Sequence, residues 1–219
     1  MSWSRGGHGP GRRGYHHGNL REALIEAALA LIAAKGPLGI TVAEAARSAG
    51  GSPAAPYRHF RDRDELMAEV ARRGFERFAL DLERAWNNGL PDPITAFERV
   101  GRAYLAFARA EPAYYAAMFE AGVPVEASPE LQAAGERAFG ILRQAATTLA
   151  ARLPEGQRPP ALMMALHVWS MAHGIASLFT RGEAAGQRLP MSTGDLLEAG
   201  VLIYLRGLGL TGGDAPPKG

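Results

Sequence analysis

The chain has 219 residues, enough to bury a substantial hydrophobic core without covalent cross-links. It contains no cysteine, which excludes disulfides, thiolate metal sites and cysteine nucleophiles. The net charge is only +2, but residues 1–63 carry +5 and residues 64–219 carry −3. A basic head on a mildly acidic body predicts that the head meets a polyanion.

The N-terminal residues 1–17 are rich in Gly and Arg and lack the apolar run of a signal peptide. No stretch approaches the ~18 consecutive apolar residues that cross a bilayer. We therefore expect a cytoplasmic protein without membrane contact, with a flexible basic arm at 1–17 and a flexible tail at 211–219. If the polyanion is DNA, Arg12 and Arg13 of this arm would insert into its minor groove. A solvated tail that adds only non-specific affinity is the alternative.

Two helices are expected after the arm. Apolar residues recur on one helical face from about 19 to 35, and a Gly-Pro pair ends this helix. Thr41 and Glu44 then form a capping box at the start of a second, short helix. A Gly-Gly pair ends the second helix, so the chain turns sharply at that point.

The segment 41–60 has the form of a helix-turn-helix. A third helix is expected from Ser52 to Phe60, with Ser52 as N-cap and Pro53 at its first position. Pro56 removes one backbone donor, so this helix is expected to be irregular. In such a motif the last helix lies in the major groove, and its first residues meet base edges. A helical hairpin within a core is the alternative, which the polar side chains disfavour.

Candidate DNA contacts follow from this geometry. Hydroxyls and helix N-termini bind phosphate, small side chains let the backbone approach the groove, and Tyr, Arg and His donate hydrogen bonds to bases or phosphates. The candidates are Arg12, Arg13, Thr41, Ser52, Pro53, Ala54, Ala55, Tyr57, Arg58, His59 and Arg63.

The rest of the chain predicts longer helices and no strand. A fourth helix starts at the cap Asp62 and runs to about Trp86. Pro and Gly residues then delimit five more helices, at about 94–110, 112–121, 129–153, 159–182 and 193–209. The fold class is therefore all-α, with about nine helices.

Residues 15–70, YHHGNLREALIEAALALIAAKGPLGITVAEAARSAGGSPAAPYRHFRDRDELMAEV, resemble the TetR family of transcriptional regulators. The resemblance rests on the Gly-ended first helix, the T-x-x-E-x-A second helix, the G-x-S-x-x-x-x-Y-x-H-F recognition segment and the D/K-x-x-L start of the fourth helix. Gly51 stands where the family often has Val, and Arg63 where it often has a phosphate-contacting Lys. The segment VWSMAHGIASL (168–178) resembles a subgroup named for its Trp…His-Gly signature.

The resemblance implies a homodimer of nine-helix chains that usually represses transcription. It implies a helix-turn-helix domain at 18–63 and a ligand-binding and dimerisation domain at 64–210. A cavity in the second domain would have an aromatic and Met-rich lining, which favours an apolar or aromatic effector. The lining candidates, for each of which ordinary core packing is the alternative, are Trp86, Phe97, Tyr104, Phe107, Tyr114, Met118, Phe119, Trp169 and His173.

The homodimer is expected to form through the last two helices, 159–182 and 193–209, whose faces carry Ala, Leu, Met and Gly. Two recognition helices about 34 Å apart, or a multiple of that spacing, would then read a near-palindromic operator in double-stranded DNA. An effector that moves the fourth helix would change this spacing and release the DNA.

Three other functions stay open at this point. They are an activator or co-repressor-dependent regulator, an enzyme with an appended helix-turn-helix, and a dimeric scaffold. The sequence has no Gly-rich phosphate loop, no H-E-x-x-H and no G-x-S-x-G, so we expect no enzyme and no cofactor. The histidines near the N-terminus lack neighbouring acids or cysteines, so we expect no metal site.

Overall fold

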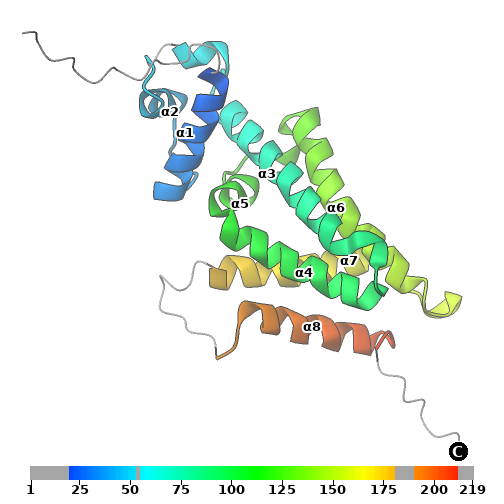
Figure 1. The fold of residues 1–219 in the computed structure, drawn as a ribbon. Coiled ribbons are helices and arrows are strands. Elements are labelled where there is room, and N and C mark those ends of the chain that lie inside the picture. The colour runs from blue at the N-terminus through cyan, green and yellow to red at the C-terminus, as the bar shows by residue number, and fades with distance from the viewer. Residues whose placement is uncertain (1–19, 53–54, 181–189, 212–219) are drawn as a thin grey trace, which may run out of the picture.

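The computed structural model describes residues 20–52, 55–180 and 190–211. The arm predicted at 1–17, and the tail predicted at 211–219 beyond its first residue, lie outside this part of the chain. The described residues are all helical: they form eight α-helices joined by short 3-10 and π turns, with no strand (Figure 1). The predicted all-α class is therefore confirmed.

The head contains α1 (Leu20–Lys35) and α2 (Val42–Ser48), at the positions predicted. Thr41 Oγ1 accepts a hydrogen bond from the Glu44 amide at 3.1 Å, as a capping residue does. The Glu44 carboxylate accepts a hydrogen bond from Lys35 Nζ at 2.7 Å, and the pKa of Glu44 is lowered by this bond and by a hydrogen bond from the Thr41 backbone, the reciprocal half of the predicted capping box. The contact with Lys35 joins the end of α1 to the start of α2.

The third helix of the head is much shorter than the predicted span 52–60. The structure has a 3-10 turn over Ala55–Arg58, and residues 53–54 lie outside the described part. The Pro56 carbonyl accepts hydrogen bonds from the amides of His59 and Phe60, at 2.8 and 3.1 Å. Pro56 itself has no amide hydrogen to donate, so a regular helix is not sustained here. The described residues therefore hold eight α-helices where about nine helices were predicted.

Six longer helices form the rest of the molecule, near their predicted positions: α3 (Arg63–Trp86), α4 (Pro93–Ala110), α5 (Pro112–Phe119), α6 (Pro129–Ala150), α7 (Ala161–Ile175) and α8 (Thr193–Gly207). Asp62 caps α3 by accepting a hydrogen bond from the Glu65 amide at 2.9 Å. Helix α3 leaves the head and runs into the body, where it packs against α4, α5 and α6 (Figure 1). A single rigid element therefore connects the two parts.

One helical stretch among the described residues, Ala161–Phe179, is long and apolar enough to cross a membrane by length and composition. Packed helices of globular proteins meet the same criteria, so this is weak evidence for a membrane span. The sequence predicted no membrane span because it has no long uninterrupted apolar run. In this helical stretch His167, Ser170 and His173 interrupt the apolar residues.

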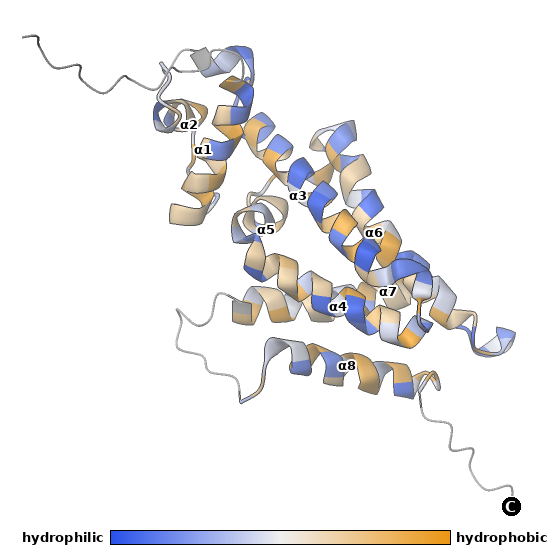
Figure 2. Cartoon of the chain, viewed as in Figure 1, coloured by the Kyte–Doolittle hydropathy of each residue, from blue (hydrophilic) through white to orange (hydrophobic). Residues whose placement is uncertain are grey.

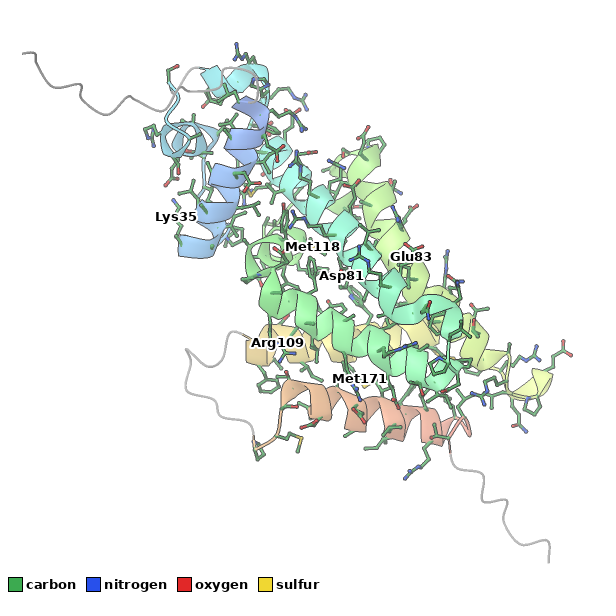
Figure 3. The ribbon with its side chains drawn as sticks, viewed as in Figure 1. Lys35, Asp81, Glu83, Arg109, Met118 and Met171 are labelled. Atoms are coloured by element: carbon green, nitrogen blue, oxygen red, sulfur yellow. The ribbon has the colours of Figure 1, made fainter. Side chains whose placement is uncertain are left out.

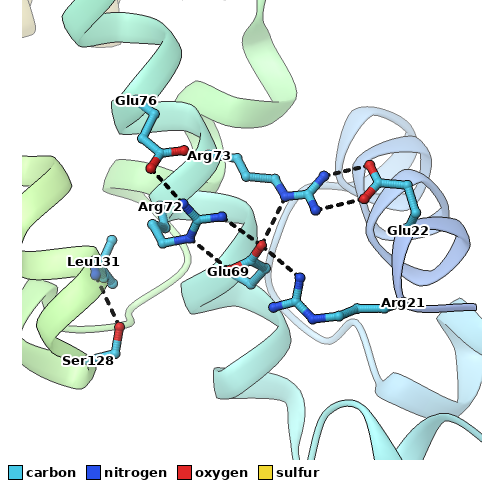
Figure 4. Close-up of polar contacts among 8 residues, drawn as sticks. All are labelled: Arg21, Glu22, Glu69, Arg72, Arg73, Glu76, Ser128 and Leu131. Atoms are coloured by element: carbon cyan, nitrogen blue, oxygen red, sulfur yellow. Dashed lines mark hydrogen bonds and ion pairs between the residues drawn. The ribbon is translucent and has the colours of Figure 1, made fainter. Parts of the chain in front are cut away.

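Glu69 of α3 accepts hydrogen bonds from three arginines, one of which lies on α1 in the head (Figure 4). Its carboxylate accepts hydrogen bonds from Arg21 of α1 at 3.1 Å and from Arg72 and Arg73 of α3 at 2.8 to 2.9 Å. Arg73 also donates two hydrogen bonds to Glu22 of α1. The Glu69 side chain is only 10% exposed, so water screens this network weakly. The crossing of α1 over α3 is thereby fixed.

The network sets the protonation of Glu69. Burial alone would raise the pKa of this carboxyl, but hydrogen bonds from the three arginines outweigh it and hold the pKa at about 2, below the ordinary 4.5. A carboxyl whose pKa falls on folding stabilises the fold above its unfolded pKa. That stability is lost as the pH falls through the folded value.

We predict that Glu69→Gln lowers the free energy of unfolding at pH 7 by roughly 1–3 kcal/mol. The deficit relative to the parent protein should shrink to about half at pH 3, because the parent has by then lost part of the Glu69 contribution. Urea unfolding at the two pH values measures both quantities. Glu83→Gln, which removes the well-exposed pair with Arg137, is the matched control and should cost less than about 0.5 kcal/mol. An equal loss of stability for Glu69→Gln at both pH values would contradict the lowered pKa assigned to Glu69.

Candidate functional site

The 3-10 turn of the head presents two polar side chains to solvent. Tyr57 is 51% exposed and Arg58 is also exposed. Arg58 Nε donates a hydrogen bond to His59 Nε2 at 3.1 Å, which orients the guanidinium. Phe60, only 1% exposed, anchors the end of the turn in the core beneath the Arg21 guanidinium. The turn is thus fixed from inside while its outer face stays available to a partner.

The other predicted DNA contacts differ in what the structure shows of them. Thr41 and Ser52 are both exposed, one before α2 and one before the turn that begins at Ala55. The Thr41 hydroxyl accepts a bond from Glu44 and retains its own hydrogen for donation. Four further candidates lie outside the described residues: Arg12, Arg13, Pro53 and Ala54.

Arg63, predicted to contact phosphate, lies between the head and the body. Its Nη2 donates hydrogen bonds to the carbonyl of Pro37, in the α1–α2 loop, at 3.1 Å and to the carbonyl of Ala121, just after α5, at 2.8 Å. Its Nη1 pairs with Asp64 at 2.6 Å, and the side chain is 27% exposed. We call this arrangement the Arg63 bridge. It joins two segments that the sequence places 84 residues apart.

The body encloses a cavity of about 520 Å³ between α3, α4, α5, α6 and α7. Four predicted residues line it: Tyr104, Met118, Phe119 and Trp169. Sequence analysis missed several other lining side chains, which come from α3, α4 and α6: Phe75, Phe78, Leu82, Val100, Phe139 and Leu142. Spacing within each helix gave no signal for them, because a cavity wall and a packed core have the same periodicity.

The remaining predicted aromatic residues are buried without lining the cavity. Trp86 closes the end of α3, where a Cβ at Gly89 would lie 3.3 Å from its ring. Phe107 packs against Phe78 with ring centroids 5.0 Å apart, and Tyr114 lies under the Arg77 guanidinium. Phe97, only 2% exposed, is ordinary core.

His173 lies behind the cavity wall within a neutral hydrogen-bond network. Its Nδ1 is 2.9 Å from the hydroxyls of both Tyr104 and Tyr115, and its ring packs near Trp169 with centroids 5.7 Å apart. Burial lowers the pKa of His173 and raises that of Tyr104. The network therefore holds the two lining side chains Tyr104 and Trp169 in place without supplying a cation.

The end of α5 lies between the cavity and the Arg63 bridge. Its wall includes Met118 and Phe119, and the bridge binds the carbonyl of Ala121, two residues further on. Met118 lies between α5 and α3 (Figure 3), where a Cβ at Gly74 would lie only 2.8 Å from its sulfur. A displacement of Met118 therefore acts on both α3 and the end of α5.

Helix α8 carries many apolar residues (Figure 2), and some of the apolar side chains of α7 and α8 are exposed. Ile203 of α8 is 74% exposed, and α7 exposes further large apolar side chains: Leu162, Met163 and Leu166. Within the chain, α7 and α8 meet where Met171 lies against Gly200. The apolar face of this pair thus extends beyond the contact within one chain, as expected of an interface.

Two protein families match the chain. Residues 24–70 match the bacterial regulatory proteins of the tetR family, and residues 97–203 match the tetracyclin repressor-like C-terminal domain. The HTH-type transcriptional regulator BetI of Rhizobium meliloti (strain 1021) is 40% identical over 52 residues. That stretch spans 24% of this chain and 26% of the relative. The resemblance of residues 168–178 to the Trp…His-Gly subgroup stays a prediction.

Solved structures share the whole fold. A protein of unknown function from Rhodococcus sp. RHA1 is 30% identical, with a TM-score of 0.72, over 90% of this chain and 98% of that one. The TetR family transcriptional regulator PfmR of Thermus thermophilus is 21% identical, with a TM-score of 0.64, over 84% and 97% of the two chains. The head and the body are therefore arranged as in these relatives.

We predict that the cavity tolerates added volume where a packed part of the same helix does not. Ala138→Leu projects into the cavity and should change the free energy of unfolding by less than about 1 kcal/mol. Ala145→Leu, at a fully buried position of α6 away from the cavity, should cost roughly 1–3 kcal/mol by overpacking. Urea unfolding of both variants tests this. Equal losses of stability in the two variants would mean that the cavity is closed in solution.

Proposed function

The chain belongs to the TetR family of bacterial regulatory proteins, and we propose that it is a homodimeric repressor that a small apolar or aromatic effector releases from a near-palindromic operator. Membership makes it a DNA-binding transcriptional regulator with a helix-turn-helix. The observation that carries the proposed repressor mechanism is the Arg63 bridge. It joins the head that carries Tyr57 and Arg58 to the end of α5, two residues beyond Phe119 in the wall of an apolar cavity.

DNA recognition is assigned to the outer face of the head. Tyr57, Arg58 and His59 would contact bases or phosphates, with Ala55 close to the groove. Thr41 and Ser52 would contact phosphates beside the two helix starts. The proposed surface also includes four residues assigned from the sequence alone: Pro53, Ala54 and the arm residues Arg12 and Arg13. The domain boundary proposed between 63 and 64 falls at the first residue of α3, so the head ends where the connecting helix begins.

The homodimer is assigned to α7 and α8. Their exposed apolar side chains would be covered by the same two helices of a second copy, in a four-helix interface. A stable interface buries about 800 Å² per partner. The two-fold axis would place two heads on one face of the DNA, which the near-palindromic operator requires. A cytoplasmic location follows from this role.

The release mechanism follows the contacts from the cavity to the head. An effector that enters displaces Met118 and Phe119, and the end of α5 moves with them. The Arg63 bridge passes this movement to Pro37, and the head tilts about the start of α3. The spacing of the two heads then no longer matches the operator. The same contacts would serve an activator or a regulator whose effector recruits DNA. In the latter, effector binding would bring the two heads to the spacing that the operator requires.

The proposed DNA role is tested by selecting bound sequences from a random duplex library. The parent protein should enrich a palindrome, and Tyr57→Ala and Arg58→Ala should abolish the enrichment while leaving salt-sensitive binding in place. Leu80→Ala, at an exposed position of α3 in the body, is the control and should enrich the same palindrome. Binding to no DNA at low salt would favour a scaffold. A catalytic activity without sequence preference would favour an enzyme.

We predict that Arg63→Ala loosens the two segments that the bridge joins. Amide hydrogen exchange around Pro37 and Ala121 should accelerate by about tenfold or more, because the lost contacts raise the population of locally open states. Exchange in α6 should stay unchanged. Arg61→Ala removes only an exposed contact with Glu65 and should alter neither segment. Unaltered exchange in Arg63→Ala would contradict the mechanism.

A further inference from the structure

We infer that the cavity takes a lipophilic cation, that is, an ammonium group attached to an apolar chain or ring. This rests on the proposed role of the cavity as the effector site and names the class of molecule that fills it. Three features of the cavity support a cationic ligand: aromatic walls, a mouth with two carboxylates and, among the described residues, a lining without basic side chains.

Two pairs of aromatic side chains line the cavity. Phe75 of α3 and Phe119 of α5 meet edge to face with ring centroids 5.6 Å apart. Phe139 of α6 and Trp169 of α7 meet in the same way at 6.2 Å. All four side chains line the cavity. Aromatic faces attract a cation electrostatically, and they also bury the apolar part of a ligand.

Two carboxylates line the mouth. Glu126 lies in the 3-10 turn Val125–Ala127, and Glu136 lies on α6. Gln132, which also lines the mouth, donates a hydrogen bond to Glu136 at 2.9 Å. Among the ion pairs of the described residues, none involves either carboxylate. Both charges are thus available to a cationic group.

The mouth is preformed. A Cβ at Gly135 would lie 2.9 Å from the Val125 side chain, so the absence of a side chain at this position lets the turn pack directly on α6. This contact fixes the segment that carries Glu126 against the helix that carries Glu136. A cation bound at this opening is attracted by both carboxylates.

An anionic ligand finds no partner. Among the residues that the structure describes, none of those that line the cavity is Arg, Lys or His. His173 lies behind the wall, where burial lowers its pKa and keeps the ring neutral, and its Nδ1 faces two tyrosine hydroxyls. A carboxylate or phosphate would leave water without a compensating charge, and it would face the negative mouth. A neutral ligand avoids this penalty but gains nothing from the two carboxylates.

Three probes with the same ten-carbon chain test the inference: decyltrimethylammonium, 1-decanol and decanoate, each below its aggregation concentration. Calorimetric titration into the full chain should give at least tenfold tighter binding for the ammonium probe than for decanoate. Ala138→Leu should weaken binding of the ammonium probe and of 1-decanol, which locates both in the cavity.

The double variant Glu126→Gln/Glu136→Gln should lower the ammonium affinity at least fivefold and leave that of 1-decanol unchanged. Glu130→Gln/Glu155→Gln is the control: both positions are exposed and outside the lining, and the change in net charge is the same.

Equal affinities for the three probes, or tighter binding of decanoate, would overturn the cation assignment and leave the effector role intact. Binding of no probe would overturn both. Tight, carboxylate-dependent binding of the ammonium probe that leaves operator affinity unchanged would support the ligand class and contradict release by the effector.

Discussion

Helix α3 belongs to both halves of the molecule, and the rest of the structure depends on how firmly each half holds it. The head holds its first turns through the half-buried Glu69 network, which reaches two residues of α1. In the body, the remaining turns of α3 pack against α4, α5 and α6. Because an α-helix of this length resists bending, a change at the body end produces a rotation of the head.

The local chemistry of the sequence predicted the frame of the fold. Caps such as Asp62, and breaks marked by Gly and Pro, act over a few residues and can be read directly. The irregular third helix was anticipated from Pro56, although its reduction to a 3-10 turn was not. The Arg63 bridge could not be predicted, because its acceptors are backbone carbonyls in two distant loops. The positions of Phe75 and Phe78 in the cavity wall could not be predicted either, because they depend on how five helices meet.

The two ends of the molecule present opposite surfaces. The head exposes polar side chains on a turn held from beneath by Phe60, which suits a charged and hydrated partner. The far helices expose apolar side chains such as Ile203, which suit a second copy of the same face. The proposed effector cavity lies between these surfaces, so in the proposed mechanism an event inside the body reaches the DNA only if the proposed dimer face stays still while α3 moves.

The spacing between the two heads of the dimer is the quantity on which the account depends, and spin-label distance measurement reports it directly. The chain has no cysteine, so Ser48→Cys on the exposed end of α2 places one label on each head. We predict one narrow distance distribution in the parent, and a shifted or broadened distribution once Arg63→Ala and Glu69→Gln remove two polar attachments of the head to the body. The same narrow distribution in both proteins would show that α3 is held by other contacts and would contradict the account.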